Sequence, residues 1–156
     1  MILLRVLLVT WLLGPLTAAA SDVAVVVHPA NPQSDVSNVE LTRIFRLDQQ
    51  HWQAGGRVYL VLREAGAPQK DVVLRRLYRM DNLELKQFWL GKLYRGEIAS
   101  FPRVVSSDAL VKQIVSRAPN AIGFIDAADL DDTVKALRIA GLLPGESGYL
   151  LSTAED

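Results

Sequence analysis

Residues 23–27 read Val-Ala-Val-Val-Val, an apolar run in which four of the five residues are β-branched. A strand with one exposed face alternates polar and apolar residues, so an unbroken apolar run indicates a strand buried on both faces. Residues 57–62 (RVYLVL) and 121–125 (AIGFI) predict two more strands, and residues 134–139 predict a fourth. A sheet covered on both faces is therefore the expected core.

Helical patterns separate these strands. The helices are expected to begin at Ser37, Pro68, Asp81 and either Ser106 or Ser107. Their apolar stripes recur with helical spacing and comprise Leu41, Ile44 and Phe45; Val73, Leu74, Leu77 and Tyr78; Leu85, Phe88 and Trp89; and Leu110, Val111, Ile114, Val115 and Ala118. Strands alternating with helices predict one α/β domain with a largely parallel or mixed sheet and helices on both faces. Residues 28–34, 63–67 and 96–105 are expected loops, and residues 149–151 are expected to form a further short strand.

The first twenty residues have the pattern of a secretory signal peptide. Arg5 precedes an apolar run over residues 6–13, and three alanines end the segment at Ala20. The run is shorter than the roughly 20 apolar residues that span a bilayer. We expect cleavage after Ala20, a periplasmic mature chain of residues 21–156, and no membrane span in that mature chain.

The inventory of reactive residues argues against an enzyme. The chain has no Cys and two histidines, His28 and His51, whose spacing fits no metal motif. It lacks the GxSxG, P-loop and GxGxxG motifs, so we expect no catalytic residue, no metal and no cofactor. The formal net charge is zero, which argues against a nucleic-acid partner.

Charge is concentrated near one predicted strand–loop–helix junction. Residues 63–96 carry eight basic and four acidic side chains, whereas residues 97–156 carry five basic and nine acidic ones. Arg63 ends the second strand, Gly66 permits close approach of the backbone, and a helix opens at Pro68. Unpaired N–H groups at a helix N-terminus favour anions. The junction is a candidate anion site, and a solvated basic surface is the alternative interpretation.

Several phrases in order resemble the phosphate-binding proteins of ABC transporters, over about residues 23–140. These phrases are Ile44-Phe45, Trp52, Gly55-Gly56, the strand that reaches Arg63, Phe88-Trp89, Gly96, Pro102, Ser107-Asp108 and the run PNAIGF at residues 119–124. The short, single-domain, exported members of this family are the most similar.

The resemblance implies a single lobe of a type II periplasmic binding protein, formed by residues 21–156, with a central mixed or parallel sheet and helices on both faces. Full-length relatives hold phosphate between two lobes, and this chain has room for one. Their loop after the second strand reads roughly R-x-x-G-S-G-T. Here Arg63 matches the arginine, but Gly66, Ala67 and Pro68 replace the hydroxyl-bearing residues.

Two functions follow from this comparison. In the first, the domain binds phosphate or a similar oxyanion weakly, and a second copy or a partner chain supplies the missing wall. The expected ligands are Arg63, Gly66, Ala67, Gln69 and Lys70, with contributions from Asn31 and Ser34. In the second, the domain has lost the ligand site and acts as a non-catalytic module that binds an envelope protein.

Overall fold

The computed structural model describes residues 21–154, so the predicted signal peptide lies outside the described residues. The elements, in chain order, are β1 (Val23–Val27), β2 (Asp35–Val36), α1 (Asn38–Phe45), β3 (Tyr59–Arg63), α2 (Pro68–Val73), the π-helical η1 (Leu74–Tyr78), α3 (Asn82–Tyr94), β4 (Arg103–Val105), α4 (Asp108–Val115), β5 (Ala121–Asp126), the 3-10 helix η2 (Ala127–Asp129), β6 (Lys135–Ala136) and β7 (Arg138–Ile139). No helix within residues 21–154 combines the length and apolar character needed to cross a bilayer.

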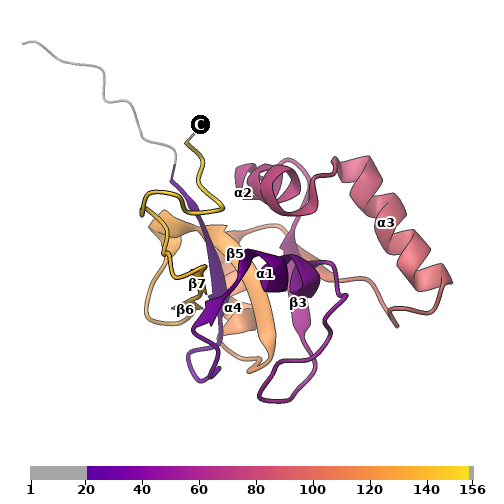
Figure 1. Cartoon of the computed structure of the whole chain (residues 1–156), viewed down its shortest axis with the longest axis horizontal. Helices are drawn as coiled ribbons and strands as arrows, with labels where there is room; N and C mark the ends of the chain where they lie inside the picture. Colours follow the sequence, from indigo (N-terminus) through magenta and orange to yellow (C-terminus); the bar gives the residue numbers. More distant parts are fainter. Residues whose placement is uncertain (1–20, 155–156) are drawn as a thin grey trace, which may run out of the picture.

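A mixed five-stranded sheet in the order β4-β3-β5-β1-β6 forms the centre of the molecule (Figure 1). β3 pairs in parallel with β4 on one side and with β5 on the other. β1 pairs antiparallel with β5, in a register that places Val23 opposite Asp126 and Val27 opposite Ile122. The two-residue strands β2 and β7 pair separately, in parallel.

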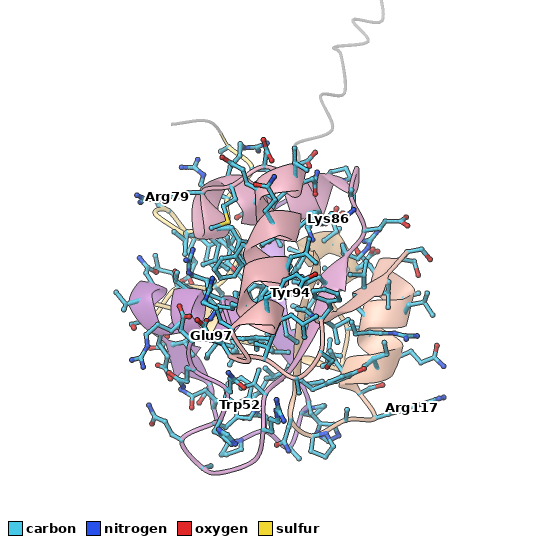
Figure 2. The ribbon with its side chains drawn as sticks, turned by 90° about the vertical axis from the view of Figure 1, so that its right-hand side faces the viewer. Trp52, Arg79, Lys86, Tyr94, Glu97 and Arg117 are labelled. Atoms are coloured by element: carbon cyan, nitrogen blue, oxygen red, sulfur yellow. The ribbon has the colours of Figure 1, made fainter. Side chains whose placement is uncertain are left out.

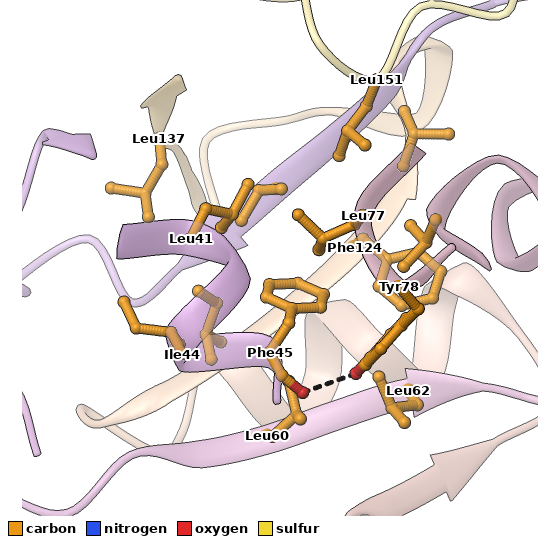
Figure 3. Packing of buried hydrophobic residues seen from close by; sticks show 14 of the residues in the cluster. Leu41, Ile44, Phe45, Leu60, Leu62, Leu77, Tyr78, Phe124, Leu137 and Leu151 are labelled. Carbon is orange, nitrogen blue, oxygen red and sulfur yellow. Dashed lines mark hydrogen bonds between the residues drawn. The ribbon is translucent and has the colours of Figure 1, made fainter. Parts of the chain in front are cut away.

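Successive residues of β1 enter different cores, which confirms the strand buried on both faces. Val23, Val25 and Val27 pack with α1, η1 and part of α3 on one face. Ala24 and Val26 pack with α4 on the other face. Figure 3 shows the larger core, in which the ring of Phe45 in α1 packs against the rings of Tyr78 and Phe124. The predicted helices on both faces are therefore confirmed.

The helices begin where their capping residues predict. The Ser37 hydroxyl accepts a hydrogen bond from the Glu40 N–H at 3.0 Å at the start of α1. Asp81 and Glu84 form a reciprocal capping box at the start of α3. The helix that opens at Pro68 widens into η1, whose Tyr78 hydroxyl donates to the Phe45 carbonyl oxygen at 2.6 Å. This bond joins the end of α1 to η1 inside the core.

Four details of the predicted structure are wrong. Residues 103–105 were expected in a loop but form β4. Arg103 and Val104 are exposed, so the strand forms through its backbone pairing with β3. The predicted strand over residues 134–139 is two short strands, because β6 pairs with β1 and β7 pairs with β2. Residues 149–151 form turns that bury Tyr149 and Leu151 without joining the sheet. Leu110 of α4 was expected to be buried but is exposed. In that stripe only Val111 and Val115 are fully buried.

Gly123→Ala is expected to destabilise the protein. The added Cβ would lie 2.7 Å from Cγ1 of Val111 and 3.3 Å from the carbonyl oxygen of Val61, and overpacking of this kind costs about 1–3 kcal/mol. Urea unfolding of the variant measures the cost. Val111→Ala removes the nearer atom, so the double variant should lose less stability than the sum of the two single variants. Strictly additive losses would contradict close packing of α4 on β5.

Candidate functional site

The candidate site lies at the edge of the sheet where the parallel strands β3, β4 and β5 end. We call this the carboxyl edge. Arg63 is the last residue of β3 and is paired with Val105, while β5 ends nearby at Asp126. The chain leaves β3 through residues 64–67 and enters α2 at Pro68. Four of the predicted ligands therefore lie on one loop–helix junction next to Arg63, as the sequence predicts.

Arg63 is held by an internal carboxylate. One guanidinium nitrogen donates to Oδ1 of Asp108, the first residue of α4, and a second donates to the Ser106 carbonyl oxygen at 3.2 Å. Oδ2 of Asp108 accepts from the Asp126 N–H at 2.8 Å. The pair is largely buried, and it ties together the ends of β3, α4 and β5. The positive charge of Arg63 is thus largely compensated, whereas its Nε atom is buried without an acceptor.

Lys70 supplies a second cation, and this one has no counterion. Its side chain is 4% exposed, and its Nζ donates to the Arg63 carbonyl oxygen at 3.2 Å. Within residues 21–154 no carboxylate lies within ion-pairing distance of this amine. Burial lowers the pKa of Lys70 from 10.5 to about 8. At neutral pH the amine is therefore charged, partly desolvated, and available to an anion.

The other residues of the junction could bind a ligand only through backbone groups and the side-chain amide of Gln69. Gly66 has a positive φ of +88°, and no atom lies within 4 Å of the position of a Cβ added there. Ala67 is the N-cap of α2 and has no side-chain hydrogen bond to the helix, and Pro68 lacks an N–H donor. Oε1 of Gln69 is buried and has no partner within the described part of the chain. The junction therefore presents two cations and one internal carboxylate. Gly66, Ala67 and Pro68 carry no side-chain hydroxyl that could bind an anion.

Asn31 and Ser34 lie at the opposite edge of the sheet, so their predicted part in the same site is wrong. They follow the carboxyl end of β1, which runs antiparallel to β5 and therefore ends where β5 begins. The Asn31 side chain accepts from the Gln33 N–H at 2.9 Å, and its carbonyl oxygen accepts from Lys135. The Ser34 carbonyl oxygen accepts from the Arg138 N–H at 3.0 Å. Both residues organise the loop beside β6 and β7.

Asp108 belongs to this site although the local sequence pattern does not place it there. The sequence indicates that Ser107 and Asp108 open a helix, and Ser107 does cap α4. Nothing in the local pattern places that helix start beside Arg63, because the intervening strand β4 was expected to be loop. The available signal is the Ser107-Asp108 pair itself, which is one of the phrases that resemble the phosphate-binding proteins.

The aromatic side chains Trp52 and Trp89 are buried, and Trp52 lies at the edge of the sheet opposite the junction. Trp52 is buried, and its indole N–H donates to the Asn120 carbonyl oxygen at 3.0 Å. Trp89 packs edge-on against Tyr78, and the half-buried Phe88 packs against Trp89. The predicted packing role of Phe88 and Trp89 is confirmed.

Comparison of the sequence with protein-family models finds no match, and comparison with curated proteins finds none either. Solved structures do match. A phosphate ABC transporter substrate-binding protein from Clostridium perfringens, solved with bound phosphate, has a TM-score of 0.65 and 22% identity over 80% of this chain and 47% of that chain. An ABC-type phosphate transport receptor from Vibrio cholerae gives a TM-score of 0.65 and 22% identity over 80% and 48% of the two chains. PstS from Borrelia burgdorferi gives a TM-score of 0.64 and 16% identity over 81% and 50%.

The chain spans about half the length of these three structures. At identities of 16–22% the agreement concerns the fold. The resemblance seen in the sequence is confirmed at this level, because the mixed sheet and its two helical layers match part of each binding protein. The chain has the fold of a single lobe of the phosphate ABC transporter substrate-binding proteins.

The Lys70→Met variant is expected to be more stable than the wild type near neutral pH, because it removes a buried charge. This difference in the free energy of unfolding should shrink as the pH rises. The pKa of Lys70 in the folded state, about 8, lies below the ordinary 10.5, so the unfolded state holds the proton more tightly between these values. The cost of burying the charged amine is complete below pH 8 and disappears towards pH 10.5. The stability of the variant relative to the wild type should therefore fall by about 3 kcal/mol over this range. Urea unfolding at several pH values measures it, and a constant difference would contradict the buried charge.

Proposed function

We propose that this chain is an exported lobe of the phosphate-binding-protein type that binds phosphate or a similar small oxyanion with modest affinity at the carboxyl edge. Lys70 carries the proposal, because it is a buried cation with no counterion among residues 21–154, and it donates to the backbone of Arg63. Export to the periplasm rests on the signal-peptide pattern of residues 1–20.

The other polar groups of the junction support the same chemistry. The Nε–H of Arg63 lacks an acceptor within the part of the chain that the structure describes, and the exposed backbone at Gly66 permits close approach of a ligand. Arg63, Lys70 and Asp108 together carry a formal charge of +1, which attracts a small anion. One of the structures with the same fold was solved with phosphate bound.

The same groups limit the affinity. A hydrogen bond to a charged group contributes about 1.5–3 kcal/mol. Lys70 supplies one such bond, and Arg63 supplies a weaker one because Asp108 already occupies its guanidinium. No hydroxyl is present among Gly66, Ala67 and Pro68. We therefore expect a Kd between about 1 mM and some tens of micromolar, unless a second copy or a partner chain encloses the ligand.

A non-catalytic module that binds an envelope protein is the second candidate. The observation that favours it is the ion pair between Arg63 and Asp108, which turns a potential ligand group into a structural one. A lobe used in this way would keep its fold without phosphate affinity. The structures with the same fold are binding proteins and receptors, which supports a role without catalysis in either case.

Calorimetric titration of residues 21–156 with phosphate distinguishes the two candidates. We expect saturable binding in the wild type and loss of binding in Lys70→Met. This substitution is preferable to a change at Arg63, which would leave the buried Asp108 carboxylate unpaired. Ser34→Ala is the matched control, because Ser34 lies at the opposite edge, and it should bind as the wild type does. No heat at millimolar phosphate would reject oxyanion binding and favour the protein-binding module.

Asp108→Asn is expected to strengthen phosphate binding roughly three- to tenfold. The substitution removes the negative charge beside Arg63 and releases its guanidinium to the ligand, at nearly constant volume. Glu64→Gln removes an exposed negative charge from the same loop and should change the affinity less than about twofold, because solvent screens that carboxylate. Equal effects of the two substitutions would show that only net charge matters and that Arg63 does not contact the ligand.

A further inference from the structure

A groove of about 590 Å³ runs between α3 and the strands β3 and β4, and its lining includes Arg63 and Lys70 of the anion site. Figure 2 shows α3 crossing the front of the molecule, with Lys86 near its start and Tyr94 at its end. α3 runs back towards the start of β4, so its first turns lie near the carboxyl edge and its last turns lie near Phe101. A volume of this size is typical of small-molecule sites.

Four large apolar side chains open onto this groove. Leu83 and Leu90 come from α3, whereas Phe101 and Val104 come from β4 and the segment before it. They are 37–64% exposed, although the larger apolar side chains of the helices and strands are mostly buried. Exposed apolar groups gathered on one concave surface indicate a binding site more strongly than scattered ones do.

The charged groups of the groove are all cationic. Arg63, Lys70 and Lys86 line it, and no Asp or Glu does so within the described part of the chain. The indole Nε1 of Trp89, another lining residue, is a buried donor that has no acceptor among residues 21–154. Because Asp108 already compensates Arg63, the buried charge that remains is the single amine of Lys70. A ligand with one negative charge matches this surface.

The cations lie towards one end of the groove, whereas apolar side chains line its whole length. Arg63 and Lys70 lie at the carboxyl edge, and Lys86 lies one turn before Leu90. Phe101 precedes the first residue of β4 and therefore lies towards the other end, as does Leu90. The end of the groove at the carboxyl edge is therefore lined by cations together with Val104, which pairs with Leu62, and Leu83 of the first turn of α3, whereas the other end is lined by apolar side chains alone.

We propose that this groove binds a linear acyl carboxylate, with the carboxylate at Lys70 and Lys86 and the alkyl chain along Leu90, Phe101 and Val104. One charge on the ligand matches the one uncompensated buried cation, and an unbranched chain matches an open, elongated apolar surface. Longer chains bury more methylene groups, so affinity should increase about three- to tenfold for two added methylenes until the groove is filled. The proposal goes beyond oxyanion binding and does not rest on it.

Calorimetric titration of residues 21–156 with decanoate, below the concentration at which it forms micelles, tests this proposal. We expect saturable binding of one molecule, and weaker binding of decanol, which lacks the charge. Leu90→Asp should weaken decanoate binding at least tenfold, because it places an anion beside the alkyl chain. Tyr94→Asp is the matched control on the same helix, since Tyr94 is 88% exposed and does not line the groove; its effect should stay below about twofold.

Val104→Asp provides an independent variant on the opposite wall, because Val104 is 53% exposed and belongs to β4. It should weaken decanoate binding to a similar degree. Leu90 lies on the third turn of α3, away from Arg63 and Lys70, so Leu90→Asp should change the phosphate affinity less than about twofold. Loss of oxyanion binding and loss of acyl binding are therefore separate outcomes in that variant. The proposal is overturned if decanoate gives no saturable binding, if decanol binds as tightly, or if Leu90→Asp and Tyr94→Asp have equal effects.

Discussion

The antiparallel pairing of β1 with β5 determines which parts of the chain meet. β1 lies between β5 and β6, buried on both faces, and its register runs from Val23 opposite Asp126 to Val27 opposite Ile122. Because β5 is parallel to β3, this pairing sends the start of β1 to the carboxyl edge and its end to the opposite edge. The loop after β1 is thereby separated from the loop after β3, although both follow strands of one sheet.

Much of the fold could be predicted from local patterns, whereas strand direction could not. The apolar run of β1, the Ser37 cap and the capping box at Asp81 each act within a few residues, and each appears as expected. β4 has three residues, of which only Val105 is buried, so its strand character comes from pairing with β3. The direction of β1 depends on a partner about a hundred residues away. Arg63 and Lys70 are seven residues apart, so the local pattern places them at one junction. The position of Asn31 and Ser34 depends on the direction of β1, which the local pattern does not indicate.

The two cations of the carboxyl edge differ in how the fold uses them. Arg63 is committed to Asp108, and this ion pair joins three elements where they end. Lys70 has no carboxylate among the described residues and bears the full cost of desolvation, which lowers its pKa to about 8. A buried ion pair stabilises little beyond the desolvation that it costs, so Arg63 is best understood as an organising residue. The unpaired amine is the group that an anion would stabilise.

The oxyanion site and the acyl groove share Arg63 and Lys70, and the Lys70 amine is central to both because Asp108 compensates the charge of Arg63. The most direct test is the pKa of the Lys70 amine, measured by NMR of the side-chain nitrogen without and with phosphate. We predict a pKa of about 8 in the free protein and a higher value with phosphate, because an anion stabilises the charged amine. A pKa near 10.5, or a value that phosphate does not change, would contradict the account.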